Sequence, residues 1–181
     1  MLSWLARMAS IPLAVENLNL PAWLPTPYAV VTKCGQHGPG PSGFAEYSPD
    51  RTESAWIKYG TLLAMGEART QDFIAKIVNS DKGCIVRVPP VLYAFRYEGV
   101  GYIVMQHIHG HDCSEDDINE IAIAVKRLRS IESPTTSPGP VGGGPVTHRF
   151  FPDHRSSLRY NSVGELQEHV NSVGGTFYSS Y

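Results

Sequence analysis

The chain has 181 residues, a length that allows one ordinary domain with its own core, or one domain and an extension. Its 15 Lys and Arg residues nearly balance its 17 Asp and Glu residues, so a net charge of −2 gives no general electrostatic argument for nucleic acid or an anionic membrane as partner. The three cysteines, Cys34, Cys84 and Cys113, are widely spaced and support neither a disulfide framework nor a zinc knuckle. We therefore expect a reducing, cytoplasmic location.

The first 60 residues predict an arm followed by three short strands. Prolines interrupt residues 1–27, which we expect to form an N-terminal arm. Residues 28–34 (YAVVTKC) are rich in β-forming side chains and predict a strand, and 35–43 (GQHGPGPSG) predict a loop. Two further strands are expected in 44–48 (FAEYS) and 54–60 (SAWIKYG).

A helix and then the strongest β signal of the chain follow. Residues 61–80 predict a helix, and five side chains lie near one stripe of it: Leu63, Thr70, Phe73, Ile74 and Ile77. Residues 85–88 form a short extended run that ends at two prolines. Residues 91–97 and 100–105 flank Glu98 and Gly99, which together predict an antiparallel hairpin.

The last third of the chain contains the clearest helix and much irregular sequence. Residues 114–131 (SEDDINEIAIAVKRLRSI) predict a helix in which Ser114 is the N-cap and Asp117 takes the third position of a capping box. Its apolar residues recur at helical spacing: Ile118, Ile121, Val125, Leu128 and Ile131. Residues 132–146 are too rich in Pro and Gly for regular structure, 163–171 predict a short helix, and 174–181 predict a frayed tail.

The order of these elements is the layout of a kinase nucleotide lobe: strand, loop, strand, strand with a lysine, helix with a glutamate, then strands that end in IVM. The local sequences AWIKYG, GEARTQDFI, VRVPPVLYAF and GYIVMQHIHG resemble the aminoglycoside phosphotransferase-like family of the protein-kinase-like fold, and GPVGGGP and YNSVGELQEHVN resemble it more loosely. The resemblance covers roughly residues 28–171. It implies an α+β fold with a kinase-like small lobe over 28–108, and a partial second lobe over 109–181 made of one helix, a Pro/Gly-rich linker, a short helix and an irregular tail.

The resemblance also implies ATP as cofactor and phosphoryl transfer to a small molecule as the family activity. Lys58 would bind the phosphates, and Glu67 would hold that lysine. The backbone of four residues would bind adenine: Met105, Gln106, His107 and Ile108. The alternatives are an exposed strand lysine, a glutamate favoured by the helix dipole, and an ordinary edge strand that runs into a loop. The loop 35–43 departs from GxGxxG and contains two prolines, so we expect a surface loop first and a phosphate flap second.

The residues that would activate an acceptor hydroxyl and hold magnesium are missing from the sequence. A kinase supplies its base in an HxDxxxxN-type motif and a metal-binding Asp soon afterwards. The aspartates after the predicted hinge, the adenine-binding segment 105–108, lie outside such a motif: Asp112, Asp116, Asp117 and Asp153. HGHDCSEDDIN (109–119) has the wrong spacing for a catalytic loop and follows the hinge at once. We expect a family member that stops early, with catalytic residues unassigned, magnesium ligands missing, and nucleotide binding at most.

Two other function classes are open. The first is a catalytically dead interaction or regulatory fragment that associates, through its unpaired lobe surface, with a full-length relative or another protein. The second is metal binding by alternating side chains on one extended segment: His107, His109, His111 and Cys113. The phosphoryl acceptor is left unspecified, because one fold serves many substrates.

Overall fold

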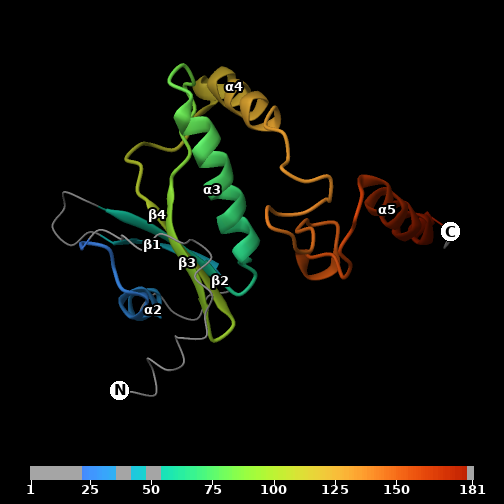
Figure 1. Ribbon diagram of the computed structural model, residues 1–181, viewed down its shortest axis with the longest axis horizontal. Coiled ribbons are helices and arrows are strands. Elements are labelled where there is room, and N and C mark those ends of the chain that lie inside the picture. Colours follow the sequence, from blue (N-terminus) through green and yellow to red (C-terminus); the bar gives the residue numbers. More distant parts are fainter. Residues whose placement is uncertain (1–21, 36–41, 48–53, 179–181) are drawn as a thin grey trace. The chain divides into compact units, whose positions relative to one another are not determined.

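The computed structural model describes residues 22–35, 42–47 and 54–178, and the chain divides between Ser130 and Ile131 into two compact units. Most of the predicted N-terminal arm and most of the predicted 35–43 loop lie outside these residues. The first unit contains, in chain order (Figure 1), α2 (Pro27–Gly35), β1 (Ser42–Tyr47), β2 (Ala55–Gly60), α3 (Met65–Ser80), β3 (Val91–Tyr97), β4 (Val100–Gln106), a 3-10 turn (Glu115–Asp117) and α4 (Ile118–Arg129).

The four strands form one antiparallel sheet in the order β1-β2-β4-β3. β2 lies inside the sheet, and its residue Lys58 pairs with Phe44 on β1 and with Ile103 on β4. Because successive side chains of a strand point to opposite faces, each inner strand serves two cores. The fold is therefore α+β, as the sequence predicted.

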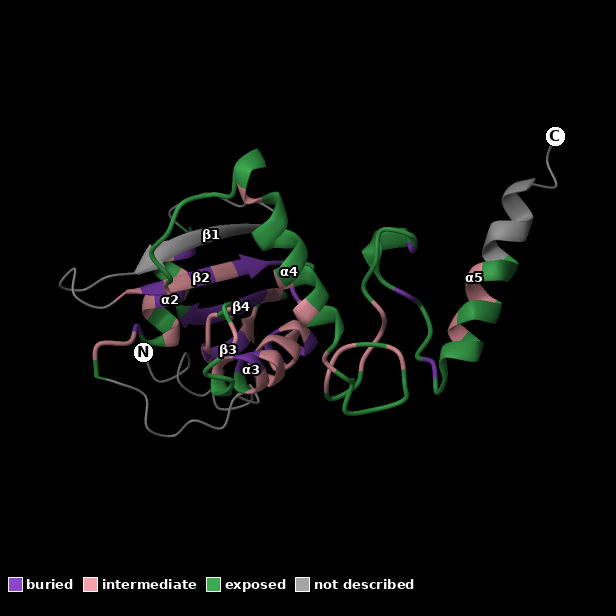
Figure 2. Cartoon of the chain, turned by 90° about the horizontal axis from the view of Figure 1, so that it is seen from above, coloured by how far each residue is buried: buried purple, intermediate pink, exposed green. Residues whose placement is uncertain are grey.

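One helix covers each face of the sheet. On one face, Val30 and Cys34 of α2 pack with Ile57, Phe95, Tyr102 and other buried side chains of the strands. On the other face, Ala68 of α3 packs with a second set: Leu63, Val91, Ala94, Ile103 and Met105. The two cores explain why β4 is buried over most of its length (Figure 2).

Helix α2 corrects the prediction of a strand over 28–34. Thr26 accepts a hydrogen bond from the Ala29 N–H through its hydroxyl at 3.2 Å, and Pro27 occupies the first helical position. An N-terminal Thr followed by Pro is a helix start signal. Val30 and Cys34 lie four residues apart and are both buried, so helical periodicity outweighs the β propensity of the valines.

Helix α3 begins at Met65, four residues later than predicted, and it buries a different stripe. The residues that face the sheet are mostly small: Gly66, Ala68, Ala75 and Val78. The larger predicted residues Phe73, Ile74 and Ile77 are only half-buried. Small side chains on this face let the helix approach the sheet closely.

The predicted hairpin is confirmed. β3 and β4 are joined by Glu98 and Gly99, with φ angles of 48° and 83°, and a two-residue turn with two positive φ values is the form that matches strand twist. The segment 84–90 lies outside the sheet, and Asn79 of α3 holds it. The Asn79 side-chain amide donates to the Val88 carbonyl at 2.8 Å, and its carbonyl accepts from the Val88 N–H at 3.0 Å.

The second unit is mostly irregular, as predicted for residues 132–146. It contains one isolated bridge between Thr147 and Arg155, a 3-10 turn (Pro152–His154) and α5 (Val163–Tyr178). Helix α5 continues to Tyr178, so the prediction that 174–181 is a frayed tail is wrong for most of that segment. A nucleated helix gains one hydrogen bond per added residue, which offsets the cost of two glycines. Within the described ranges, no helix has the length and apolar character needed to span a membrane.

Candidate functional site

Lys58 lies in the middle of β2, on the face of the sheet that α3 covers. Trp56, two residues earlier on the same face, packs against the core formed with α3. The Lys58 side chain is 34 % exposed, so it is neither buried nor fully solvated. Lys58 therefore extends from β2 toward solvent beside α3.

Glu67 forms an ion pair with Lys58 through its carboxylate and the lysine ammonium group. It lies in the first turn of α3, where a negative charge is favoured by the helix dipole. Its backbone N–H donates to the Ala64 carbonyl at 2.9 Å, which closes the first turn. The structure therefore brings together Lys58, which the resemblance assigned to phosphate binding, and Glu67, which it assigned to holding that lysine.

The predicted adenine-binding residues lie at the end of β4. Met105 is buried inside the sheet between β2 and β3, and its sulfur accepts a hydrogen bond from the Gln71 side-chain amide at 3.4 Å. Gln106 is the exposed last residue of the strand, and its backbone N–H donates to the Pro90 carbonyl at 3.0 Å. The backbone of these two residues is therefore part of the hydrogen-bonded sheet.

The next two residues differ in how their backbone groups are used. The His107 N–H donates to the Ser54 carbonyl at 3.2 Å. Ile108 is 51 % exposed, and its backbone N–H has no acceptor within the described part of the chain. Of the four residues, Ile108 is the one whose N–H has no acceptor among the residues that the structure describes, which leaves it available to a ligand.

The side chains of Trp56 and His107 form an aromatic pair beside these backbone groups. Their ring centroids lie 5.2 Å apart at an interplanar angle of 23°, and the Ser54 hydroxyl lies 2.9 Å from His107 Nδ1. His109 approaches His107 with a centroid distance of 4.4 Å. No sequence pattern singled out Ser54 or Trp56; the one available signal was that Trp56 shares a strand face with Lys58.

Lys58 and the end of β4 are close in the sheet. Lys58 pairs with Ile103, which precedes Gln106 by three residues, so about 10 Å of strand separates the two positions. This separation is similar to the span between the base and the phosphates of an extended nucleotide. Ile108, the residue with the available N–H, lies two residues beyond Gln106.

Asp117, one of the aspartates after β4, has a structural role. Ser114 donates to its carboxylate from the backbone N–H at 2.7 Å and from the hydroxyl at 2.9 Å, which completes the predicted capping box. These hydrogen bonds, the backbone one first, lower the pKa of the Asp117 carboxyl below its ordinary value. Among the residues that the structure describes, no group of three or more His, Cys, Asp and Glu side chains can hold a metal ion.

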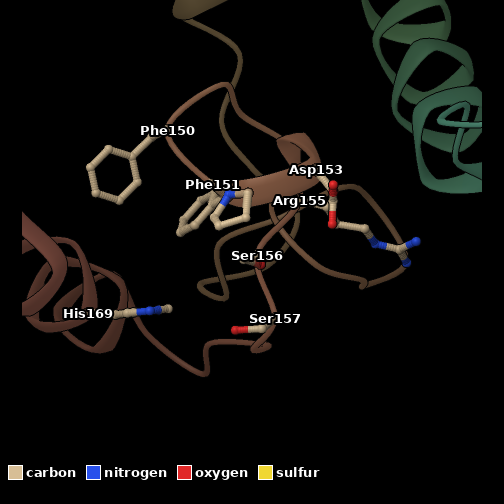
Figure 3. A pocket seen from close by; sticks show the side chains of 8 residues that line it. Phe150, Phe151, Asp153, Arg155, Ser156, Ser157 and His169 are labelled. Atoms are coloured by element: carbon tan, nitrogen blue, oxygen red, sulfur yellow. The ribbon is translucent and has the colours of Figure 1, made fainter.

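The second unit contains a cavity of about 420 Å³ (Figure 3). It is lined by Phe150, Phe151, Pro152, Asp153, Arg155, Ser156, Ser157 and His169. Several of its polar groups are already bonded within the unit. The Ser156 hydroxyl accepts from the Val146 N–H at 3.0 Å, and His169 Nδ1 lies 2.5 Å from the Tyr160 hydroxyl. The sequence contained no signal for this cavity.

No protein-family model, no curated protein and no solved structure matches this chain.

Proposed function

We propose that the first unit binds ATP as a nucleotide lobe of the aminoglycoside phosphotransferase-like, protein-kinase-like type. The observation that carries the proposal is the ion pair between Lys58 of β2 and Glu67 of α3. In kinases a strand lysine must pair with a helix glutamate before it can bind the phosphates correctly. Here the pair joins a strand and a helix that follow one another in the order such a lobe requires.

The base would bind at the end of β4. The Ile108 N–H donates to a ring nitrogen of adenine, because the N–H groups of Gln106 and His107 already donate to Pro90 and Ser54. Backbone recognition of this kind depends on the position of the strand and leaves side-chain identity free to vary. The phosphates then extend along β2 toward Lys58.

Phosphoryl transfer is outside this proposal. The sequence contains no HxDxxxxN-type base, and Asp117 is used as a helix cap. Phosphoryl transfer is catalysed mostly by positioning and charge neutralisation, and magnesium is part of that charge neutralisation. We therefore propose nucleotide binding without efficient transfer, in a reducing, cytoplasmic location that suits the free cysteines Cys34, Cys84 and Cys113.

A thermal-shift titration of the full chain with ATP, with and without magnesium, tests the proposal. A ligand that binds only the folded state stabilises it by about 2.7 kcal/mol at a hundredfold excess over its dissociation constant. We expect a saturable increase in Tm that Lys58→Ala abolishes. Lys82→Ala, which removes an exposed lysine from a turn, should leave the increase intact. A cooperative transition with no ATP-dependent shift would overturn the proposal.

A second candidate function is protein interaction without catalysis, as a regulatory fragment that binds a full-length relative or another protein. The observation that favours it is the exposure of apolar side chains along α4, described below. The titration separates the two functions. A cooperatively folded chain whose Tm does not change with ATP favours the interaction function. An ATP-dependent increase in Tm that Lys58→Ala abolishes supports nucleotide binding.

A further inference from the structure

Four apolar side chains of α4 are exposed along one stripe of the helix. Their exposed fractions are 61 % for Ile118, 39 % for Ile121, 49 % for Val125 and 37 % for Leu128. They follow one another at spacings of three, four and three residues, which is the heptad pattern of a helix that packs against another helix. We call these residues the α4 stripe; Figure 2 shows the helix largely in the colour of exposed residues.

The α4 stripe lies on a different side of the helix from the residues that the rest of the first unit partly covers. Ala124 and Arg127 are the partly covered residues of α4, and Arg127 reaches Asp81 after α3 at 3.4 Å. At 100° per residue, Ala124 lies about 80° and Arg127 about 140° from the centre of the stripe. The fold of the first unit therefore anchors α4 by one side and leaves its apolar side accessible.

The charges of α4 favour a second copy of the same helix, in the opposite direction, as the occupant of this stripe. Acidic side chains cluster at its start, and basic side chains fill its last turn. An antiparallel pair brings each acidic end against a basic end, whereas a parallel pair opposes like charges. Glu115 lies in the 3-10 turn that precedes α4 and Arg129 is the last residue of α4, so an acidic and a basic side chain stand at its two ends; Ala122 between them is small enough for close approach of two helices.

We propose that α4 is a self-association surface, which pairs antiparallel with α4 of a second copy about a two-fold axis. Ile118 then packs against Leu128 of the second copy, and Ile121 packs against Val125 of the second copy. Such an isologous contact closes at two subunits. A single helix of 12 residues makes a small interface, so the dimer is weak and forms in the micromolar range of concentration. The contact does not involve Lys58 or the end of β4, so it does not depend on nucleotide binding.

Sedimentation velocity of the full chain over about 2 µM to about 200 µM tests this proposal. We expect the mass to rise with concentration from 19.9 kDa toward twice that value. Ile121→Asp and Val125→Asp should each weaken dimerisation at least tenfold. Ile123→Asp is the matched control, because Ile123 is 52 % exposed on the opposite side of the same helix, and it should leave the dimer unchanged. Circular dichroism of each variant shows whether α4 is retained.

Exchange of charges tests the direction of the pair. Glu115→Arg or Arg129→Glu alone places like charges at both ends of the dimer and should weaken it. The double variant restores opposite charges and should recover dimerisation, although both changes oppose the helix dipole. The proposal is wrong if the chain stays monomeric throughout, if Ile123→Asp weakens association as much as Val125→Asp, or if the double variant is weaker than either single one.

Discussion

Lys58 on β2 and Glu67 in the first turn of α3 form an ion pair that connects the sheet to the helix. Their side chains are 34 % and 43 % exposed, and pairs this exposed contribute about 0 to 1 kcal/mol to the free energy of unfolding. The hydrophobic contacts of Ala68 and its neighbours hold α3 in place without it. The ion pair can therefore be changed without loss of the fold, so its effect on ligand binding can be measured separately.

Glu67→Gln should weaken ATP binding by about tenfold while Tm without nucleotide changes little, because the loss of one charge leaves Lys58 less well oriented. Isothermal titration calorimetry measures the affinity, and thermal denaturation without nucleotide measures the stability. Glu132→Gln, at an exposed position in the second unit, is the control. Unchanged affinity in Glu67→Gln would show that Lys58 needs no acidic partner.

Ile108→Pro should abolish ATP binding, because proline has no backbone N–H to donate to the base. Ile108→Ala keeps that N–H and removes only an exposed side chain, so its affinity should stay within about threefold of the original. The same calorimetric titration compares the two variants, and their circular dichroism should match. Equal affinities for ATP in both variants would contradict a hydrogen bond from the Ile108 N–H.

The sheet could be predicted from the sequence because its signals are local. Alternating Val, Ile, Tyr and Phe residues indicate β3 and β4, and Glu98 with Gly99 indicates the turn between them. Helix α2 was not predicted because residues 28–34 were judged by the β propensity of their valines. The helix start signal, Thr26 and Pro27, lies just before that range. In this segment the four-residue spacing of Val30 and Cys34 predicts the helix correctly, whereas the β propensity of the individual residues does not.

The site depends on contacts that no local pattern contains. The spacing of nine residues between Lys58 and Glu67 places one on a strand and one on a helix, but the distance between them follows from how α3 packs on the sheet. The pairing of Trp56 with His107 depends on the register of β2 against β4. Only the resemblance to a family predicted the first of these contacts, and nothing in the sequence predicted the second.

Gly101→Ala should destabilise the first unit by about 1 to 3 kcal/mol. A Cβ at this position of β4 would lie 2.5 Å from the Leu63 backbone oxygen and 3.1 Å from its Cβ, so the segment before α3 would have to move. Gly110→Ala is the matched control, because a Cβ there meets no atom within 4 Å. Urea denaturation measures both free energies of unfolding. Equal values for the two variants would show that Leu63 can move away without cost.

The thiol of Cys34 should make the stability of the chain depend on alkaline pH. Burial raises the pKa of this thiol from its ordinary value of 9.0 to about 11, against a smaller opposite effect of the neighbouring Lys33. The unfolded chain then loses the proton at a lower pH than the folded chain. The stabilisation is therefore present below about pH 9 and is lost between about pH 9 and about pH 11, with an upper limit of about 2 to 3 kcal/mol.

Urea denaturation at several pH values between about 8 and about 11 measures this dependence. Burial, and then Cys34, also raises the pKa of Tyr102 on the same face of the sheet, so some loss of stability at high pH should persist without the thiol. The quantity to compare between variants is therefore the slope of the free energy of unfolding against pH. Cys34→Ala should lower the stability at pH 8 by leaving a small cavity, but its stability should fall less steeply with pH than that of the original chain. Cys113→Ala removes an exposed thiol and should keep the original slope. A Cys34→Ala slope equal to the original one would show that the buried thiol does not titrate with unfolding.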